Sequence, residues 1–234
     1  MHDVSIETTS NAILSALGPE ERERLAPHLQ HHDTQLGEVF FEPGDPIDYV
    51  YFPENSMLSI VGRTIRGGSA EIGVIGREGV VGVNLLLGAP RAINAIMVQL
   101  TDGGFRLPAA EALKEFDRCG PFHKATLKFV HYLMMQISQT AVCNVLHGLE
   151  ERLAKWLLMC RDRSSGDTLH LTQEFLSLML GSTRASVTLA AISLQDLGYI
   201  SYKRGAIKVV DRQGMIDFAC DCYKVVQIGI AQNN

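Results

Sequence analysis

The spacing of apolar residues changes near residue 120, and this change constrains the fold more than any other feature of the sequence. Up to residue 118, short β-branched and aromatic runs alternate with turns such as Pro43-Gly44-Asp45-Pro46 and Gly88-Ala89-Pro90. From Pro121 onward, apolar residues recur every three or four positions. The first pattern is typical of strands and the second of helices. We therefore predict an α+β protein with a sheet part followed by a helical part.

The strand-like part predicts a β-barrel or jelly roll, because many short strands follow one another at even spacing. The expected strands lie at residues 38–41, 49–52, 57–61, 71–75, 79–83 and 93–100. A helical piece at residues 11–29 precedes them. Leu14, Leu17 and Leu25 are its expected core contacts.

Residues 122–145 form a predicted helix with two apolar faces. One face carries a heptad-like stripe, made of Leu127, Val130, Met134, Ile137 and Ala141. Phe122, Phe129 and Leu133 form a second row beside it. A helix with two apolar faces must bury both, so we predict that one lies on the barrel and the stripe packs on a second copy of the chain. The alternative is a long core helix inside a monomer.

Residues 170–198 have the pattern of a helix-turn-helix. Thr172 is expected to cap the first helix, Gly181 to form the turn, and Ser182 to cap a second helix that runs to Leu197 before Gly198. The expected core face of the second helix consists of Val187, Ala191, Leu194 and Leu197. Short and cationic residues on the opposite face, near its start, are typical of a DNA-reading helix.

A basic-tipped hairpin follows, with strand-like residues 199–202 and 206–210 on either side of its tip. This is where a winged helix presses its wing against phosphates. The predicted DNA contacts are Ser182, Thr183, Arg184, Ala185, Ser186, Thr188, Leu189, Lys203 and Arg204. Arg184 is placed to reach a guanine edge or a phosphate, while Ala185 and Leu189 offer only apolar contacts, for instance to a thymine methyl. The alternative is a structural three-helix domain with an ordinary hairpin.

The segment from Leu171 to Met215, LTQEFLSLMLGSTRASVTLAAISLQDLGYISYKRGAIKVVDRQGM, resembles the winged helix of the Crp/Fnr family of bacterial transcription regulators. Residues 37–45 (GEVFFEPGD) and 79–91 (GVVGVNLLLGAPR) resemble the early strand and the phosphate-binding cassette of that family's cyclic-nucleotide-binding-type barrel. The resemblance implies a sensor barrel at residues 1–120, a dimerisation helix and hinge at 121–147, and a DNA-binding winged helix-turn-helix at 148–234. It also implies double-stranded DNA as a partner, a homodimer, and contact with RNA polymerase if the protein activates transcription.

The resemblance places an effector pocket at Gly82, Val83, Asn84 and Arg91, with Ser138 from the long helix. Gly82 and Arg91 match the glycine and arginine that family members use for cyclic AMP, but Val83 stands where they have a glutamate. A lost charged acceptor removes about 1.5–3 kcal/mol, so we expect a degenerate pocket and no tight cyclic AMP binding. The alternative role for Arg91 is a structural ion pair. Binding of an unknown small-molecule effector is the remaining alternative for this pocket.

The cysteines and histidines predict no metal site and no cofactor. Cys220 and Cys222 are two apart on an expected helix and so point away from each other, and Cys119, Cys143 and Cys160 are scattered. We interpret His28, His31 and His32 as belonging to a solvated loop. A haem-based sensor stays as a lesser alternative, with His123, His131 or Cys119 as axial ligand.

Composition places the chain among globular proteins, since 46% of its residues are hydrophobic and 20% are charged. No signal sequence or membrane span is expected, which predicts a cytoplasmic protein with reduced thiols. Residues 1–118 hold nine basic against seventeen acidic residues, and residues 119–234 hold twelve against nine. The back half is therefore the expected site for a polyanion.

No catalytic motif is present in the sequence, so we predict that the protein is not an enzyme and has no catalytic residues. The function predicted from the sequence is a homodimeric, sequence-specific transcription regulator. The alternatives are a cyclic-nucleotide-binding signalling module with a protein-contact output, and a constitutive DNA binder with a purely structural barrel.

Overall fold

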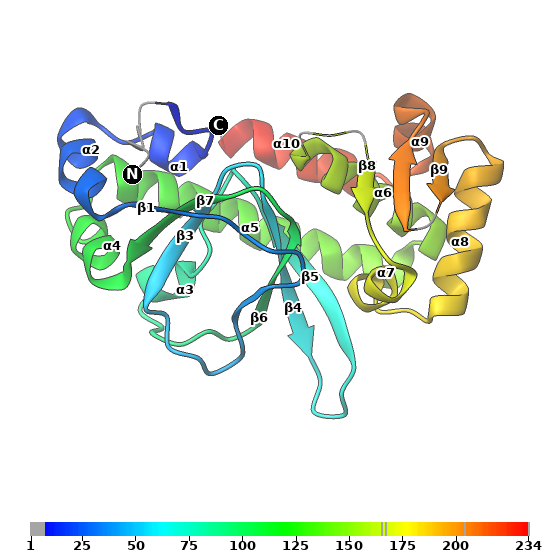
Figure 1. The fold of residues 1–234 in the computed structure, drawn as a ribbon, viewed down its shortest axis with the longest axis horizontal. Coiled ribbons are helices and arrows are strands. Elements are labelled where there is room, and N and C mark those ends of the chain that lie inside the picture. Colours follow the sequence, from blue (N-terminus) through cyan, green and yellow to red (C-terminus); the bar gives the residue numbers. More distant parts are fainter. Residues whose placement is uncertain (1–7, 165, 167, 204, 234) are drawn as a thin grey trace. The chain divides into compact units, whose positions relative to one another are not determined.

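A computed structural model of the chain describes residues 8–164, 166, 168–203 and 205–233 (Figure 1). The chain folds into two compact units. The first contains Met1–Ile60 and Val74–Met134 with the last residues Gln232–Asn234, and the second contains Val61–Gly73 and Met135–Ala231. The predicted boundaries at residues 120 and 147 stay predictions, because the two units divide within the long helix that runs between these positions.

The first unit begins with two short helices, α1 (Ala12–Ser15) and α2 (Pro19–Leu25), followed by the 3-10 helix η2 (Ala26–His28). The single helical piece expected at residues 11–29 is therefore wrong. The chain breaks at Gly18 because Pro19 has no N–H and fits best in the first turn of a new helix. The three predicted core leucines of this region are buried, as expected.

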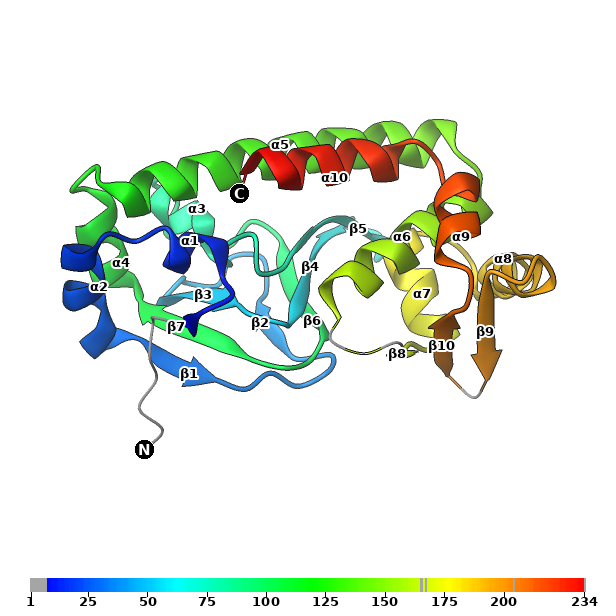
Figure 2. The same cartoon turned by 90° about the horizontal axis from the view of Figure 1, so that it is seen from above.

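Two open sheets make up the body of the first unit (Figures 1 and 2). One has the order β1-β7-β3, and the other has the order β2-β6-β4-β5 and continues into Val61–Gly73 of the second unit. Their bounds are β1 (Gln30–His32), β2 (Val39–Phe41), β3 (Tyr49–Pro53), β4 (Met57–Arg63), β5 (Ser69–Ile75), β6 (Ala95–Leu100) and β7 (Gly104–Pro108). The sheets are jelly-roll-like, which confirms one of the two predicted architectures; the barrel is not closed.

One predicted strand of this part is wrong. At residues 79–83 only Val81 pairs, in a single bridge to Tyr51, and the helix α3 (Val83–Leu86) follows at once. Gly82 has φ +84°, a left-handed conformation that ends an extended run. Strands β1 and β7 were missed by the sequence analysis. His31 and His32 therefore lie in a strand and not in the expected loop.

The helices α4 (Ala109–Phe116) and α5 (Pro121–Leu146) follow the sheets. The second apolar row of α5 is buried, with Phe122 and Phe129 fully covered. The stripe is different: Leu127 is 44% and Met134 is 64% exposed, and Ala141 is also exposed. Within one chain, α5 therefore buries one apolar face and leaves much of the other open.

The second unit holds a helical core and a small sheet of order β8-β10-β9. Its elements are α6 (Leu149–Arg163), β8 (Thr168–His170), α7 (Gln173–Leu180), α8 (Arg184–Asp196), β9 (Ile200–Lys203), β10 (Ala206–Val209), α9 (Arg212–Phe218) and α10 (Cys222–Asn233). The last residue of α6, Arg163, is buried, and its Nη1 donates to the Met159 carbonyl at 3.2 Å.

No single helix of the described residues is long and apolar enough to cross a membrane. Taken as one bent pair, α7 and α8 reach the required length and composition, but they are bent by 103°. Apolar residues of both helices, including Leu176 and Leu194, are buried within the protein.

Candidate nucleic-acid interface

The helix-turn-helix has the two helices and the turn that the sequence predicts. Thr172 caps α7, because its Oγ1 accepts from the Phe175 N–H at 3.1 Å. Gly181 has φ +57°, the left-handed conformation expected of the turn. The cap of α8 is Thr183, whose Oγ1 accepts from the Ser186 N–H at 3.1 Å. Ser182 was wrongly predicted as this cap, because its N–H donates to the Ser177 carbonyl inside the turn.

Helix α8 separates a buried face from an outward face. Val187, Ala191 and Leu194 are buried, as predicted, and Ala190 joins them. Leu197 was wrongly placed on this face: it is 50% exposed, because α8 ends at Asp196 and the chain turns away. Arg184, Ala185 and Leu189 are exposed on the outward side, and Leu189 is 68% exposed.

Two of the predicted DNA-contacting residues, Thr188 and Ser186, use their hydroxyls in hydrogen bonds within the helix-turn-helix. Thr188 Oγ1 lies 2.9 Å from Gln173 Oε1 of α7 and 2.8 Å from the Arg184 carbonyl oxygen. Ser186 Oγ lies 2.9 Å from Thr183 Oγ1. The bond from Thr188 to Gln173 ties α8 to α7, and the other two bonds lie within the start of α8. Arg184 is the free cation at the start of α8, because the described residues give its side chain no carboxylate partner.

The wing is the hairpin of β9 and β10, in which Lys203 pairs with Ala206. Gly205 adopts φ +79°, which closes the hairpin. Lys203 is exposed, and Arg204 lies outside the described residues. The Tyr202 N–H donates to Gln195 Oε1 at 2.9 Å, so a hydrogen bond ties the wing to α8. Strand β8, which pairs with β10, was missed, although the alternating residues Thr168 to Leu171 could have indicated it.

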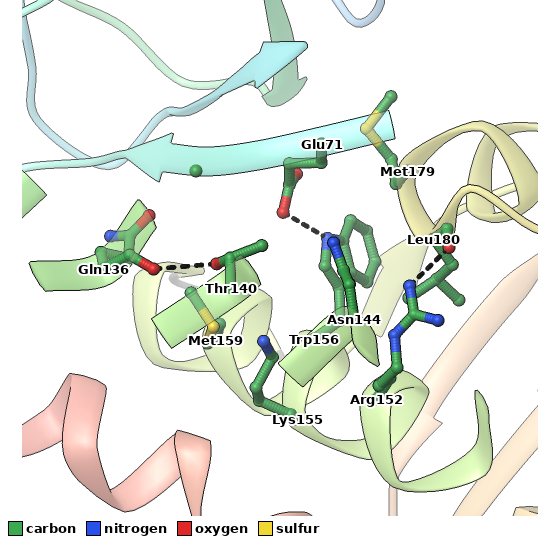
Figure 3. A pocket seen from close by; sticks show the side chains of 11 residues that line it. Glu71, Gln136, Thr140, Asn144, Arg152, Lys155, Trp156, Met159, Met179 and Leu180 are labelled. Atoms are coloured by element: carbon green, nitrogen blue, oxygen red, sulfur yellow. Dashed lines mark hydrogen bonds between the residues drawn. The ribbon is translucent and has the colours of Figure 1, made fainter. Parts of the chain in front are cut away.

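A small cavity beside α6 shows how the helix-turn-helix is anchored within the second unit (Figure 3). Trp156 Nε1 donates to the buried carboxylate of Glu71 from β5 at 3.0 Å. Arg152 Nη2 donates to the Leu180 carbonyl at 2.6 Å and so satisfies the end of α7. Sequence reasoning missed both residues, because their partners lie 85 and 28 positions away along the chain.

The predicted sensor pocket is built differently from the helix-turn-helix. Val83 is 5% exposed and packed in the core, and α3 is only four residues long. Arg91 is exposed and its Nη1 donates to the Gly44 carbonyl at 2.7 Å, so its partner is a backbone oxygen and not the carboxylate of the ion-pair alternative. Asn84 is half-buried, and Ser138 is exposed on α5. Their roles toward an effector stay predictions.

Three of the histidines that the sequence singles out contact other groups of the protein. His31 faces Asp33 at 3.4 Å and His32 faces Glu38 at 3.3 Å, so each ring meets a different carboxylate. His123 stacks on Phe116 with ring centroids 4.1 Å apart, and its Nδ1 lies 2.9 Å from the Phe116 carbonyl oxygen. These contacts are structural, and His131 is exposed.

Three of the five cysteines gather at the end of α5. The expectation that Cys220 and Cys222 share a helix is wrong, because α10 begins at Cys222 and Cys220 lies in the turn before it. Cys143 Sγ and Cys220 Sγ are 3.6 Å apart, and His147 lies next to Cys222. The hydrogen bond from Cys220 and the nearby Lys155 ammonium lower the pKa of the Cys143 thiol to about 4. The same hydrogen bond, together with burial, raises the pKa of Cys220.

Comparisons with known proteins agree with this geometry. Residues 151–218 match the family of Crp-like helix-turn-helix domains, which spans α6 through α9. No curated protein matches the chain.

Several solved structures share the fold. FixK2 from Bradyrhizobium japonicum superposes with a TM-score of 0.69 at 15% identity, over 82% of this chain and 98% of its own. A protein from Eubacterium rectale assigned to the Crp/Fnr family of transcriptional regulators gives 0.68 at 14% identity, over 89% and 98%. The Crp/Fnr regulator TTHA1359 from Thermus thermophilus gives 0.64 at 20% identity, over 81% and 98%. The predicted Crp-like helix-turn-helix domain and the fold of Crp/Fnr regulators are thus confirmed.

Proposed function

Because this chain carries a Crp-like helix-turn-helix domain on the fold of Crp/Fnr regulators, we propose that it is a homodimeric, sequence-specific transcription regulator. The domain and the fold support DNA binding and transcription regulation. The observation that carries the finer proposal is the start of α8, where Arg184 is exposed at a capped helix N-terminus that faces outward. A helix N-terminus attracts phosphates, and an arginine next to it can read a guanine edge.

The proposal of a homodimer rests on the apolar stripe of α5. Much of this stripe is exposed in the single chain, and the exposed apolar surface continues to Val142 and Val145, which are 45% and 81% exposed. An apolar stripe of this length is stable in water only when it is covered, and a two-fold copy of the same helix covers it most simply. Two chains would then present two copies of α8 to half-sites about one helical turn apart on DNA.

The sheet part is proposed as a sensor whose ligand is not cyclic AMP. The cassette residue Val83 is apolar and buried, so it supplies no acceptor for a ribose hydroxyl. Signal transfer would act on the joint between α5 and α6, where α5 ends at Leu146 and Gly148 caps α6 by donating to Glu151 Oε2 at 3.0 Å. We place the protein in the cytoplasm with its DNA, and in contact with RNA polymerase if it activates transcription.

Selection of genomic DNA fragments by the full-length protein tests this proposal. We expect enrichment of a motif with two-fold symmetry, and a dimeric mass in light scattering. The matched control is the chain with Arg184→Ala and Lys203→Ala; both residues are exposed, so their loss should leave the fold intact. Equal enrichment by wild type and control would contradict sequence-specific reading by α8. Binding of a cyclic nucleotide without any DNA enrichment would favour the signalling module instead.

A further inference from the structure

We propose that Cys143, His147, Cys220 and Cys222 form a tetrahedral site for Zn²⁺ at the end of α5. One ligand atom from each of these residues can be chosen so that all four lie within 4.8 Å of one another. Three thiolates and one imidazole are a common donor set of structural zinc sites, and soft sulfur ligands select this metal over Mg²⁺ and Ca²⁺.

The spacing of the donors fits the geometry of zinc. Bonds of about 2.3 Å to sulfur and 2.0–2.1 Å to nitrogen place tetrahedral ligand atoms about 3.5–3.8 Å apart. In the structure, the sulfurs of Cys143 and Cys220 are 3.6 Å apart, and Cys222 Sγ is 3.4 Å from His147 Nδ1. Both pairs therefore already have the separation of two edges of the coordination tetrahedron.

The backbone explains why these four side chains meet. Cys143 and His147 are one helical turn apart, and the His147 N–H donates to the Cys143 carbonyl at 3.2 Å, so both face the same side. Cys220 lies in the tight turn between α9 and α10, and Cys222 is the first residue of α10; the Tyr223 N–H donates to the Cys220 carbonyl at 3.1 Å. The turn directs both sulfurs toward the end of α5.

The surroundings provide the second layer of contacts that metal ligands need. Asp221 Oδ1 lies 3.6 Å from His147 Nε2, the ring nitrogen that does not face the sulfurs, which is the carboxylate–histidine arrangement of many zinc sites. Gln139 Nε2 donates to Cys222 Sγ at 3.0 Å. The three cysteines are buried, so solvent is excluded from most of the site.

Charge balance also favours a divalent cation. Three thiolates and Zn²⁺ together carry one negative charge, and the ammonium of Lys155, 3.3 Å from Cys143 Sγ, offsets it. Lys155 is only 8% exposed, and a buried lysine needs a negative partner. On binding, each thiol that is still protonated releases its proton to solvent as its sulfur bonds the metal.

Metal analysis of the full-length protein, purified under reducing conditions without chelators, tests the site. We expect one zinc per chain, and a titration of the chelator-treated protein with Co²⁺ should give the visible absorption of a tetrahedral, thiolate-rich centre. Zn²⁺ should protect three thiols from a thiol reagent. Cys222→Ser and His147→Asn should lose these signals, while the control Cys119→Ser, which removes an exposed thiol outside the cluster, should keep them.

If Cys222→Ser fails to fold, Asp221→Asn takes its place, because the Asp221 side chain is 81% exposed and its loss should not unfold the chain. It should weaken Zn²⁺ binding about tenfold to a hundredfold. A folded, reduced wild type that binds neither Zn²⁺ nor Co²⁺ would overturn the proposal. A Cys143–Cys220 disulfide in the oxidised protein, together with no metal binding by the reduced protein, would overturn it as well.

Discussion

The starts of α8 and α3 show how differently the two units are built for binding. The side chain of Thr183 caps helix α8, whose first residues, Arg184 and Ala185, are exposed to solvent. Gly82 precedes helix α3, which buries Val83, Leu85 and Leu86. A helix start with exposed cationic and small residues can approach a polyanion, whereas a helix start that is packed in apolar side chains cannot. The start of α8 is therefore an exposed surface, and the start of α3 is part of a core.

The charge distribution differs between the two halves of the sequence. Nine basic residues stand against seventeen acidic ones in residues 1–118, and twelve stand against nine in residues 119–234. A phosphate backbone is therefore attracted to the back half and repelled by the front half. The comparison predicts that changes near α8 alter DNA binding strongly and that changes near α3 alter it little.

The largest effect is expected from the α5 stripe, because the proposed homodimer would present two copies of α8 to DNA as a pair. Met134→Glu with Ile137→Glu places charges in the proposed seam and should give monomers in light scattering. Affinity for the selected operator should fall at least about a hundredfold, since a monomer keeps the contacts of one half-site. Leu36→Glu, at a 55% exposed leucine elsewhere, is the control and should remain dimeric. A dimeric double variant would place the interface elsewhere.

The second largest effect is expected at α8 and the wing, where two variants distinguish reading of a base from contact with a phosphate. Arg184→Ala should cost about 1–3 kcal/mol on the operator and less on random DNA, if Arg184 reads a base. Lys203→Ala should weaken binding to all sequences alike. It should also reduce the slope of log affinity against log salt concentration by about one, the value for one lost phosphate contact. Fluorescence anisotropy at several salt concentrations measures both. Equal losses on operator and random DNA for Arg184→Ala would make Arg184 a phosphate contact.

A third effect concerns stability. Trp156→Phe removes the N–H that donates to the buried Glu71 carboxylate and should lower the free energy of unfolding by about 1.5–3 kcal/mol. Urea denaturation measures it. In a double-mutant cycle with Glu71→Leu, which removes the acceptor, the two losses should be less than additive, because either change breaks the same hydrogen bond. Additive losses would show that the bond contributes little.

The smallest effect on DNA binding is expected at residues 79–91, the segment that resembles a phosphate-binding cassette. Wild-type protein should show no cyclic AMP binding tighter than about tens of micromolar in calorimetry, because Val83 replaces a charged acceptor. Arg91→Ala should leave operator affinity unchanged within about twofold, since its partner is the Gly44 carbonyl oxygen of the same sheet part. Tight binding of cyclic AMP to the wild type would mean that Asn84 or a backbone group accepts the ribose hydroxyl.

The acid stability of the first unit offers a check that is independent of binding. Arg24 donates two hydrogen bonds to Glu115, at 2.9 and 2.7 Å, and these lower the pKa of that carboxyl below its usual range. A lowered pKa contributes stability above the unfolded value of about 4.3, and this contribution is lost as pH falls through the folded value. Arg24→Gln should therefore reduce the loss of stability on acidification below about pH 4.3. Thermal unfolding at a series of pH values measures it, and an unchanged profile would contradict it.

Sequence patterns were sufficient for the local features of the helix-turn-helix. Thr172 and Gly181 could be assigned from the chain alone, since a cap and a left-handed turn depend on residues within a few positions. The same patterns failed at residues 79–83, because apolar runs do not distinguish a strand from a buried turn that leads into a short helix. Ser182 was misassigned for a related reason, since two adjacent residues were both suitable caps.

The sequence by itself determined the order of sheet, long helix and winged helix-turn-helix, because hydrophobic period and turn chemistry are local properties. Only the tertiary structure decided which distant side chains meet. Cys143 and Cys220 are 77 positions apart, and Trp156 and Glu71 are 85 apart. No periodicity encodes such pairs, because they depend on how the turn before α10 returns to the end of α5 and how β5 packs on α6.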